Sequence, residues 1–155
     1  MNKKILMYLG ALLFLFLIAF LIFTEQKKET PSGFKNVSVE EARGMIEKAD
    51  VFVLDVRTPA EFNSSHIKGA NLIPVSNASG SNLNPDCLLE ARINEVPKNK
   101  KVLVYCRTGR RSNAASTILA NAGYSQVYNM AGGITSWIDA GYPVVSSQDQ
   151  ENKSP

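Results

Sequence analysis

The chain has only two cysteines, Cys87 and Cys106, and a single histidine, His66, among its 155 residues. A disulfide scaffold needs more cysteines, and a structural zinc site needs about four Cys or His ligands. One disulfide is arithmetically possible, but these counts exclude a disulfide-rich module and a Cys/His zinc module. We therefore expect neither a bound metal nor an organic cofactor.

A large excess of charge of one sign is also missing. The whole chain carries 17 Lys and Arg residues against 14 Asp and Glu, a net charge of +3. Without the first 30 residues, 13 basic and 12 acidic side chains remain, so the net charge falls to +1. A near-neutral domain gives no support for binding to nucleic acid, and we expect no nucleic-acid partner. Positive charge is instead concentrated locally, in Arg107, Arg110 and Arg111.

The chain contains one long apolar run, residues 5–23, which holds no charged side chain. As a helix, these 19 residues span about 28 Å, close to the hydrocarbon thickness of a bilayer. A cleaved signal peptide has a shorter apolar core and small residues before the cut, which "AFLIFTEQ" lacks. We therefore expect an uncleaved anchor. Lys3 and Lys4 favour an N-terminus inside the cell, although Lys27 and Lys28 weaken that bias. The expected location is a single pass through the cell membrane, with the soluble domain on the extracytoplasmic side.

Polar, turn-rich segments mark the boundaries of the remaining parts. "TEQKKETPSG" contains Pro31 and Gly33 and indicates a linker, and "SSQDQENKSP" indicates a disordered tail. No internal repeat is visible. We expect a short basic N-terminus at 1–4, the anchor at 5–23, a linker at 24–34, one folded domain at 35–146 and the tail at 147–155.

Within the folded part, short β-branched runs alternate with helical patterns. Ser38 and Glu41 form a capping-box signal before a helix, Pro59 indicates another helix start, and Gly123 indicates a helix end. Strands are expected at 51–56, 71–75, 101–106 and 126–130, and helices at 38–48, from 59, at 88–96, at 112–123 and from 132. The alternation indicates an α/β domain with a largely parallel central sheet flanked by helices.

The segment "KVLVYCRTGRRS" combines a buried strand, a cysteine and a short basic loop. In parallel α/β folds the working site lies at the carboxyl ends of the strands, where Asp55 and Cys106 both fall. A helix is expected to begin near Arg111 or Ser112, so the loop, with Gly109, can curl its backbone N–H groups inward. Such an anion-binding nest and the nearby arginines favour the thiolate of Cys106, which is the nucleophilic form. The alternative is a buried structural cysteine beside solvated arginines.

The same loop, "CRTGRRS", resembles the active-site loop of the single-domain rhodaneses, a family of sulfurtransferases. Further motifs match the family in the same order over about residues 37–145: Asp55-Val56-Arg57, Glu61-Phe62, His66-Ile67, Gly69-Ala70, Gly132-Gly133-Ile134 and Trp137. Several separated motifs in the correct order make this resemblance far more specific than one loop. It implies a rhodanese-like α/β domain.

The resemblance also implies a mechanism based on Cys106. This residue would take a sulfane sulfur from a small anionic donor such as thiosulfate and become a persulfide, from which a thiol or cyanide would accept the sulfur. The substrate-binding residues would be those of the loop, Arg107, Thr108, Gly109, Arg110 and Arg111. Arg111 would also order the loop. The residues expected to support the loop are Asp55, Arg57 and Ser112, with Asp55 and Arg57 as a pair.

The resemblance assigns roles to three further residues. The histidine that matches His66 is structural in this family, so we do not expect His66 to act as a base. Trp137 is expected to pack in the core. Thr108 stands where some thiosulfate-using members carry a basic residue, which leaves the physiological donor open, although the arginines could compensate.

Three other functions stay open. A cysteine phosphatase has five residues between its cysteine and its arginine, whereas four separate Cys106 from Arg111, which gives a smaller cradle. A thiol redox protein would use Cys87 to resolve an oxidised Cys106 as a disulfide, but we favour Cys87 as a buried bystander. A non-catalytic binding module is disfavoured, because inactive relatives typically lack the cysteine.

Overall fold

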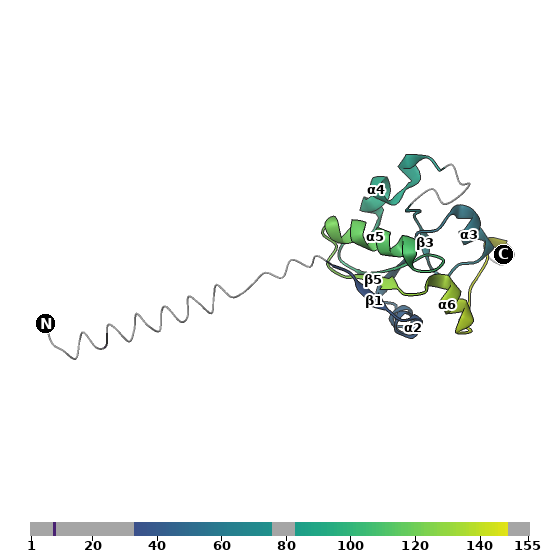
Figure 1. Cartoon of the computed structure of the whole chain (residues 1–155), viewed down its shortest axis with the longest axis horizontal. Helices are drawn as coiled ribbons and strands as arrows, with labels where there is room; N and C mark the ends of the chain where they lie inside the picture. Colours follow the sequence, from purple (N-terminus) through teal and green to yellow (C-terminus); the bar gives the residue numbers. More distant parts are fainter. Residues whose placement is uncertain (1–7, 9–32, 76–82, 149–155) are drawn as a thin grey trace. The chain divides into compact units, whose positions relative to one another are not determined.

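The computed structural model describes residues 8, 33–75 and 83–148 (Figure 1). The chain divides into two compact units, Met1–Thr30 and Pro31–Pro155. The expected membrane anchor at 5–23 lies outside the described residues apart from Tyr8, as does most of the expected tail. Among the helices that are described, none is long and apolar enough to cross a membrane.

The second unit is built on a five-stranded sheet in which neighbouring strands run parallel. The strands are β1 (Lys35–Val37), β2 (Val51–Asp55), β3 (Asn71–Leu72), β4 (Lys101–Tyr105) and β5 (Val127–Met130). Their order across the sheet is β1-β5-β4-β2-β3. β2 and β4 are neighbours, with Asp55 beside Tyr105. The predicted parallel α/β architecture is confirmed, and the carboxyl ends of β2 and β4 meet at one edge of the sheet.

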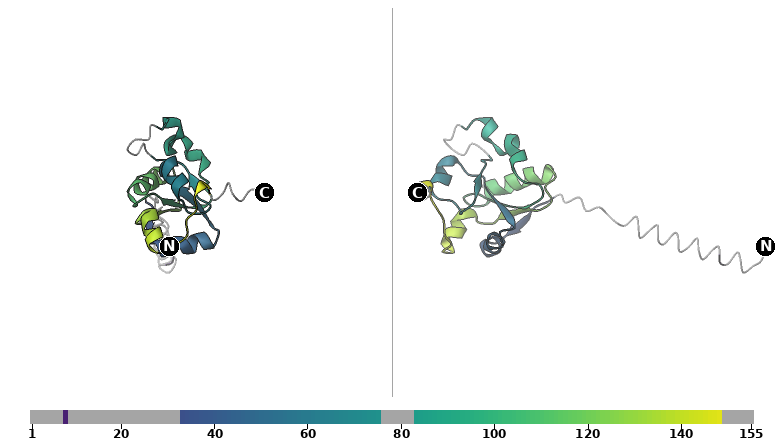
Figure 2. Two further views of the ribbon diagram at one scale, coloured as in Figure 1. Left: turned by 90° about the vertical axis from the view of Figure 1, so that its right-hand side faces the viewer. Right: turned by 180° about the vertical axis from the view of Figure 1, so that it is seen from behind.

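Helices cover both faces of the sheet (Figures 1 and 2). They are α2 (Val39–Glu47), α3 (Pro59–Ser64), α4 (Leu89–Arg92), α5 (Arg110–Asn121) and α6 (Gly133–Asp139), with the 3-10 turns η1 (Pro85–Cys87) and η2 (Ile93–Glu95). One apolar core, which includes Leu89 and Leu119, packs α4 and α5 onto the sheet. A second core, which includes Ala42 and Trp137, packs α2 and α6 onto the other face. Because β4 is buried on both faces after Lys101, the rest of the strand, residues 102–105, is a continuous apolar run.

Local sequence signals place two of the helix starts. Ser38 and Glu41 form the predicted capping box at α2, in which each side chain accepts a hydrogen bond from the backbone N–H of the other. A second box joins Thr58 and Glu61 at the start of α3, with Pro59 in its first turn. Such boxes satisfy backbone donors that a helix start leaves unpaired. The second box therefore fixes the position of Glu61.

Two strands differ from the expectation. β1 has no predicted counterpart, because Lys35 and Asn36 are exposed and give no strand pattern; its pairing with β5 makes it a strand. β3 covers only two of the five residues expected at 71–75. Pro74 follows it closely, and proline has no N–H to donate to a continuing ladder.

The expected helix at 88–96 is broken into α4 and η2. The carbonyls of Ile93 and Val96 accept hydrogen bonds from the Tyr124 hydroxyl, at 2.6 and 2.8 Å. These tertiary contacts direct both carbonyls to a side chain of another segment. The chain therefore tightens into a 3-10 turn here instead of continuing as one α-helix.

Candidate active site

The end of β4 delivers Cys106 into a tight loop that leads to α5. Gly109 adopts a left-handed backbone conformation, with φ of 96°, which glycine tolerates without strain. The Gly109 N–H donates to Sγ of Cys106 at 3.1 Å, and the Ser112 hydroxyl lies 3.5 Å from the same sulfur. Cys106 is only 1% exposed. The loop thus encloses the sulfur among hydrogen-bond donors, and α5 begins at Arg110, slightly earlier than the sequence predicts.

This cradle changes the pKa of the Cys106 thiol. Burial raises the pKa, because a thiolate loses hydration in apolar surroundings. Hydrogen bonds from the hydroxyl and N–H of Ser112, and then from the N–H groups of Thr108 and Gly109, lower it by more. The net result is a pKa below that of an ordinary thiol. The thiolate is therefore favoured, chiefly through the loop backbone and Ser112.

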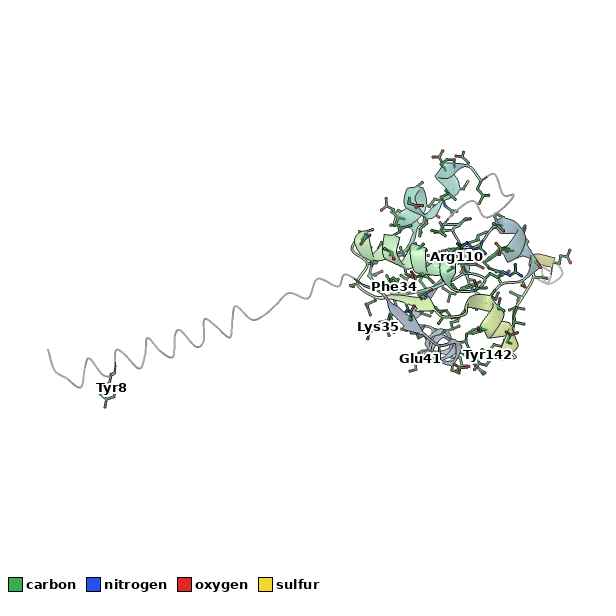
Figure 3. All side chains as sticks on the ribbon, viewed as in Figure 1. Tyr8, Phe34, Lys35, Glu41, Arg110 and Tyr142 are labelled. Carbon is green, nitrogen blue, oxygen red and sulfur yellow. The ribbon has the colours of Figure 1, made fainter. Side chains whose placement is uncertain are left out.

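The three loop arginines have different surroundings. Arg111 forms a two-pronged ion pair with Glu61 of α3, with N···O distances of 2.8 and 2.6 Å. This contact holds the pKa of Glu61 at about 2. Arg107 and Arg110 are exposed, and neither makes an ion pair with another described residue. Figure 3 labels Arg110 at the start of α5.

Arg111 accordingly occupies a loop-ordering position, since its guanidinium ties the start of α5 to α3. The sequence also assigns Arg111 to the binding of an anionic donor. The pairing fits that role poorly, because the Glu61 carboxylate already neutralises the charge of Arg111. The charges open to an anionic substrate are those of Arg107 and Arg110. Thr108, between them, is exposed as well.

Asp55 and Arg57 form a buried ion pair beside the strand that carries Cys106. Arg57 donates from Nε and Nη2 to both carboxylate oxygens, at 2.6 to 3.0 Å, and its backbone N–H adds a bond of 2.9 Å. Its Nη2 also donates to the Ser65 carbonyl at 2.7 Å. Burial, followed by the charge of Asp55, raises the pKa of Tyr105, and the Arg57 guanidinium lies over the Tyr105 ring, 5.5 Å from its centroid. The pair therefore lies against Tyr105, the residue that precedes the cysteine, and its support of the loop stays a prediction.

The start of α6 is bonded directly to the loop. The Ile134 N–H donates to the carbonyl of Cys106 at 2.8 Å, and the Thr135 N–H donates to the carbonyl of Arg107 at 3.1 Å. Gly133 permits this approach, because its φ is 61° and a Cβ there would collide with both of those carbonyl oxygens. The glycine pair of the sequence thus lets a helix pack against the loop backbone.

A cavity of about 220 Å³ opens between α3 and α6 beside the loop. Its lining residues are Arg57, Glu61, Ser64 and Ser65 on the α3 side, Arg107 of the loop, and Ile134, Thr135 and Ile138 of α6. Arg107 connects the cavity to the loop, because it directly follows Cys106. Ile138 keeps 47% of its surface exposed.

Three residues contribute to the site although the sequence assigned them no role there. Glu61 pairs with Arg111, the Tyr105 ring lies beneath the Arg57 guanidinium, and Gly133 lets α6 approach the loop. The capping-box spacing between Thr58 and Glu61 predicts the start of a helix, but it does not predict the ion pair of Glu61 with Arg111. Tyr105 carries a usable signal, since a hydroxyl at the end of a buried strand needs a partner.

His66 and Trp137 occupy structural positions. The His66 ring stacks on Phe62, with ring centroids 3.8 Å apart, and its Nδ1 lies 2.9 Å from the Phe62 carbonyl. Trp137 is buried and donates from Nε1 to the Pro143 carbonyl at 3.0 Å. Both positions agree with the packing roles expected for them.

Cys87 is exposed at the end of η1, so its expected buried position is wrong. The reason is the turn itself, in which Pro85, Asp86 and Cys87 all face solvent and burial begins only at Leu89. Cys87 and Cys106 are both free thiols. Within the described part of the chain, no group of three or more His, Cys, Asp or Glu side chains could hold a metal ion.

Replacing Ser112 by alanine is expected to raise the pKa of the Cys106 thiol, because the thiolate loses a hydroxyl that stabilises it. The rate of alkylation by iodoacetamide rises as pH passes the thiol pKa, so the profile of Ser112→Ala shifts to higher pH. The measurement uses a Cys87→Ser background, which leaves Cys106 as the single cysteine.

Ser116→Ala is the matched control for this measurement. Ser116 is also buried on α5, but its hydroxyl has no hydrogen-bond partner among the described residues. Its removal should leave the alkylation profile of Cys106 in place. A Ser112→Ala profile that overlays the parent profile contradicts the role given to the hydroxyl.

Comparison with known proteins places the domain in a family. Residues 38–140 match the model of the rhodanese-like domain. A sulfurtransferase of Allochromatium vinosum is 36% identical over 99 residues, which cover 64% of this chain and 82% of that protein. The thiosulfate sulfurtransferase GlpE of Pseudoalteromonas translucida is 28% identical over 105 residues, 68% of this chain and 90% of that protein.

A solved structure shares the same fold. The crystal structure of a rhodanese-related protein from Thermoplasma volcanium is 32% identical and superimposes with a TM-score of 0.60, covering 72% of this chain and 98% of that one. The residues matched by the family model, 38–140, include the parallel strands β2 to β5 and the whole Cys106 loop. The family resemblance seen in the separated motifs is confirmed, and the chain belongs to the rhodanese-like domain family.

Proposed function

We propose that this chain is a sulfurtransferase in which Cys106 carries the transferred sulfur as a persulfide. The observation that carries the proposal is the enclosure of the Cys106 sulfur by the loop. Burial raises the pKa of the Cys106 thiol, but Ser112 and the loop N–H groups lower it by more, so the net pKa is below that of an ordinary thiol. Relatives in the same family bear the names sulfurtransferase and thiosulfate sulfurtransferase, which supports the class of reaction.

In the first half-reaction, the Cys106 thiolate attacks the outer sulfur of an anionic donor such as thiosulfate. A bond forms between Sγ and that sulfur, the S–S bond of the donor breaks, and sulfite leaves with the electron pair of the broken bond. The exposed guanidinium groups of Arg107 and Arg110 attract the charge of the donor. The product on the protein is a persulfide with an anionic outer sulfur.

In the second half-reaction, a thiol or cyanide attacks the outer sulfur of the persulfide. The S–S bond breaks and Cys106 leaves as a thiolate, while the acceptor gains the sulfur as a persulfide or as thiocyanate. The Gly109 N–H and Ser112, which stabilise the resting thiolate, also stabilise it as the leaving group. A thiol with a lowered pKa leaves faster, so one cradle serves both steps.

The test is the intact mass of the full chain after incubation with thiosulfate. We expect a gain of one sulfur atom that cyanide removes, and no gain in Cys106→Ser, because serine lacks the nucleophile. Cys87→Ser is expected to behave like the parent chain. If thiosulfate adds nothing while iodoacetamide still alkylates Cys106, inorganic polysulfide is the next donor. If neither thiosulfate nor polysulfide adds sulfur to the chain, the role of Cys106 as a sulfur carrier is contradicted.

We further propose that residues 5–23 anchor the chain in the cell membrane, with the catalytic domain on the extracytoplasmic side. The support lies in the sequence, in 19 residues without charge that follow Lys3 and Lys4. An epitope tag after Pro155 should stay with membranes in alkaline carbonate and be removed by protease added outside spheroplasts. Release by carbonate contradicts the anchor, and protection from protease contradicts the orientation.

A further inference from the structure

The cavity between α3 and α6 contains three charged side chains, of which two are neutralised. Arg57 is paired with Asp55, and Glu61 is paired with Arg111. Arg107 is exposed, and no carboxylate among the described residues pairs with it. The charge that the cavity offers to a ligand is therefore the positive charge of Arg107.

The α6 side of the cavity is partly apolar. Ile134 and Ile138 of α6 line it together with Thr135. The volume of about 220 Å³ is smaller than the roughly 300 to 1,000 Å³ of pockets for drug-sized ligands. One cation beside a short apolar surface suits a small molecule that has one carboxylate and a short carbon chain.

The position of the cavity connects it to the sulfur-carrying residue. Arg107 follows Cys106 in the chain, and α6 is bonded to the carbonyls of both residues. Cys106 itself is almost fully buried. The outer sulfur of a persulfide lies about 2 Å beyond Sγ, so persulfide formation extends the reactive atom away from the enclosed Sγ.

We propose that this cavity binds the sulfur acceptor, and that Arg107 selects acceptor thiols that carry a carboxylate. The inference rests on the sulfurtransferase function and deepens it. The acceptor sulfur attacks the outer sulfur of the persulfide, the bond to Sγ breaks, and Cys106 leaves as a thiolate. The proton of the acceptor thiol remains with the product, which is a carboxylate-bearing persulfide. Arg107 holds the carboxylate through a charge-assisted hydrogen bond.

The alternative occupant of the cavity is the sulfur donor, but the apolar side chains of the cavity lining disfavour it. Thiosulfate has no carbon chain to place on Ile134 and Ile138, and it must reach Sγ itself rather than the outer sulfur. Arg110 does not line the cavity, so it remains for the donor. Both exposed loop arginines can attract an anionic donor, but only Arg107 lines the cavity proposed for the acceptor.

The experiment separates loading from discharge. The full chain is loaded with thiosulfate or polysulfide, and the persulfide is verified by intact mass. Its discharge is then timed with 3-mercaptopropionate, 2-mercaptoethanol and cysteamine, whose second groups are anionic, neutral and cationic. Arg107→Gln is expected to lower the rate of discharge by 3-mercaptopropionate about tenfold. The rate of discharge by 2-mercaptoethanol should change less than about twofold. Each thiol is compared between parent and variant, so intrinsic differences in nucleophilicity cancel.

Lys100→Gln is the matched control. It removes one exposed positive charge just before β4 begins, whereas Cys106 follows the end of that strand. All three rates should stay within about twofold of the parent rates, since screening weakens a distant exposed charge. The acceptor site is contradicted if Arg107→Gln slows discharge by all three thiols equally, or slows none of them. It is also contradicted if Lys100→Gln shows the same selective loss with 3-mercaptopropionate. Failure of the parent chain to form a persulfide overturns the sulfurtransferase function instead.

Discussion

Substitution of Gly133 by alanine is expected to reduce sulfur transfer about a hundredfold, the loss that a shift of about 1 Å in an active site can cause. The new Cβ would collide with the carbonyl oxygens of Cys106 and Arg107. Both are backbone atoms, so no side chain can rotate away to relieve the contact. Either α6 withdraws or the loop shifts, and both outcomes break the bonds from Ile134 and Thr135 to the loop. The measurement is the rate of thiocyanate formation from thiosulfate and cyanide.

Gly141→Ala separates this collision from ordinary backbone strain. Gly141 also has a positive φ, 75°, but nothing lies within 4 Å of a Cβ built there. Alanine at that position should cost about 1–3 kcal/mol of stability through strain alone and keep the rate of sulfur transfer. Urea unfolding of both variants reports the stability. If Gly133→Ala transfers sulfur as fast as Gly141→Ala, the close approach of α6 is not required by the loop.

Replacement of Arg57 by leucine is expected to lower the free energy of unfolding by about 3–5 kcal/mol. The Asp55 carboxylate is fully buried and would lose its guanidinium partner, so an unpaired charge would remain in the core. The Ser65 carbonyl would lose a donor as well. For a domain of this size, the melting temperature should fall by roughly 10 to 20 °C. Thermal unfolding of the full chain, followed by circular dichroism, measures the change.

Two further variants show whether the unpaired charge causes the loss. Arg92→Leu removes one partner of a solvent-exposed pair of similar length, Arg92–Glu95, and should cost less than about 1 kcal/mol. The double variant Asp55→Leu with Arg57→Leu removes both buried charges and should cost less than the sum of the two single changes. An Arg57→Leu loss no larger than that of Arg92→Leu contradicts the account.

The sequence predicts the local part of the site well. Cys106, Gly109 and Ser112 lie within seven residues, so the order of strand, loop and helix alone brings them together. Asp55 and Arg57 are two residues apart and pair without help from distant segments. The alternation of strands and helices also predicts the parallel sheet, because a crossover helix must cover each pair of buried strands.

Contacts between distant segments could not be predicted in this way. Glu61 and Arg111 are separated by 50 residues, and nothing in either segment identifies the other as its partner. The pairing neutralises Arg111 and leaves Arg107 and Arg110 without an ion-pair partner among the described residues, which the sequence alone does not show. The cavity depends in the same way on how α3 and α6 are placed around Arg107.

The pairing of β1 with β5 has a consequence for synthesis of the chain. Asn129 Nδ2 donates to Asn36 Oδ1 at 2.8 Å across the two strands, between residues 93 positions apart. A ribosome adds about 5–20 residues per second, so the first strand waits roughly 5–20 seconds for the partner that completes the sheet. During that interval it is an unpaired edge, and Lys35 and Asn36 make it a polar one that resists pairing with another nascent chain.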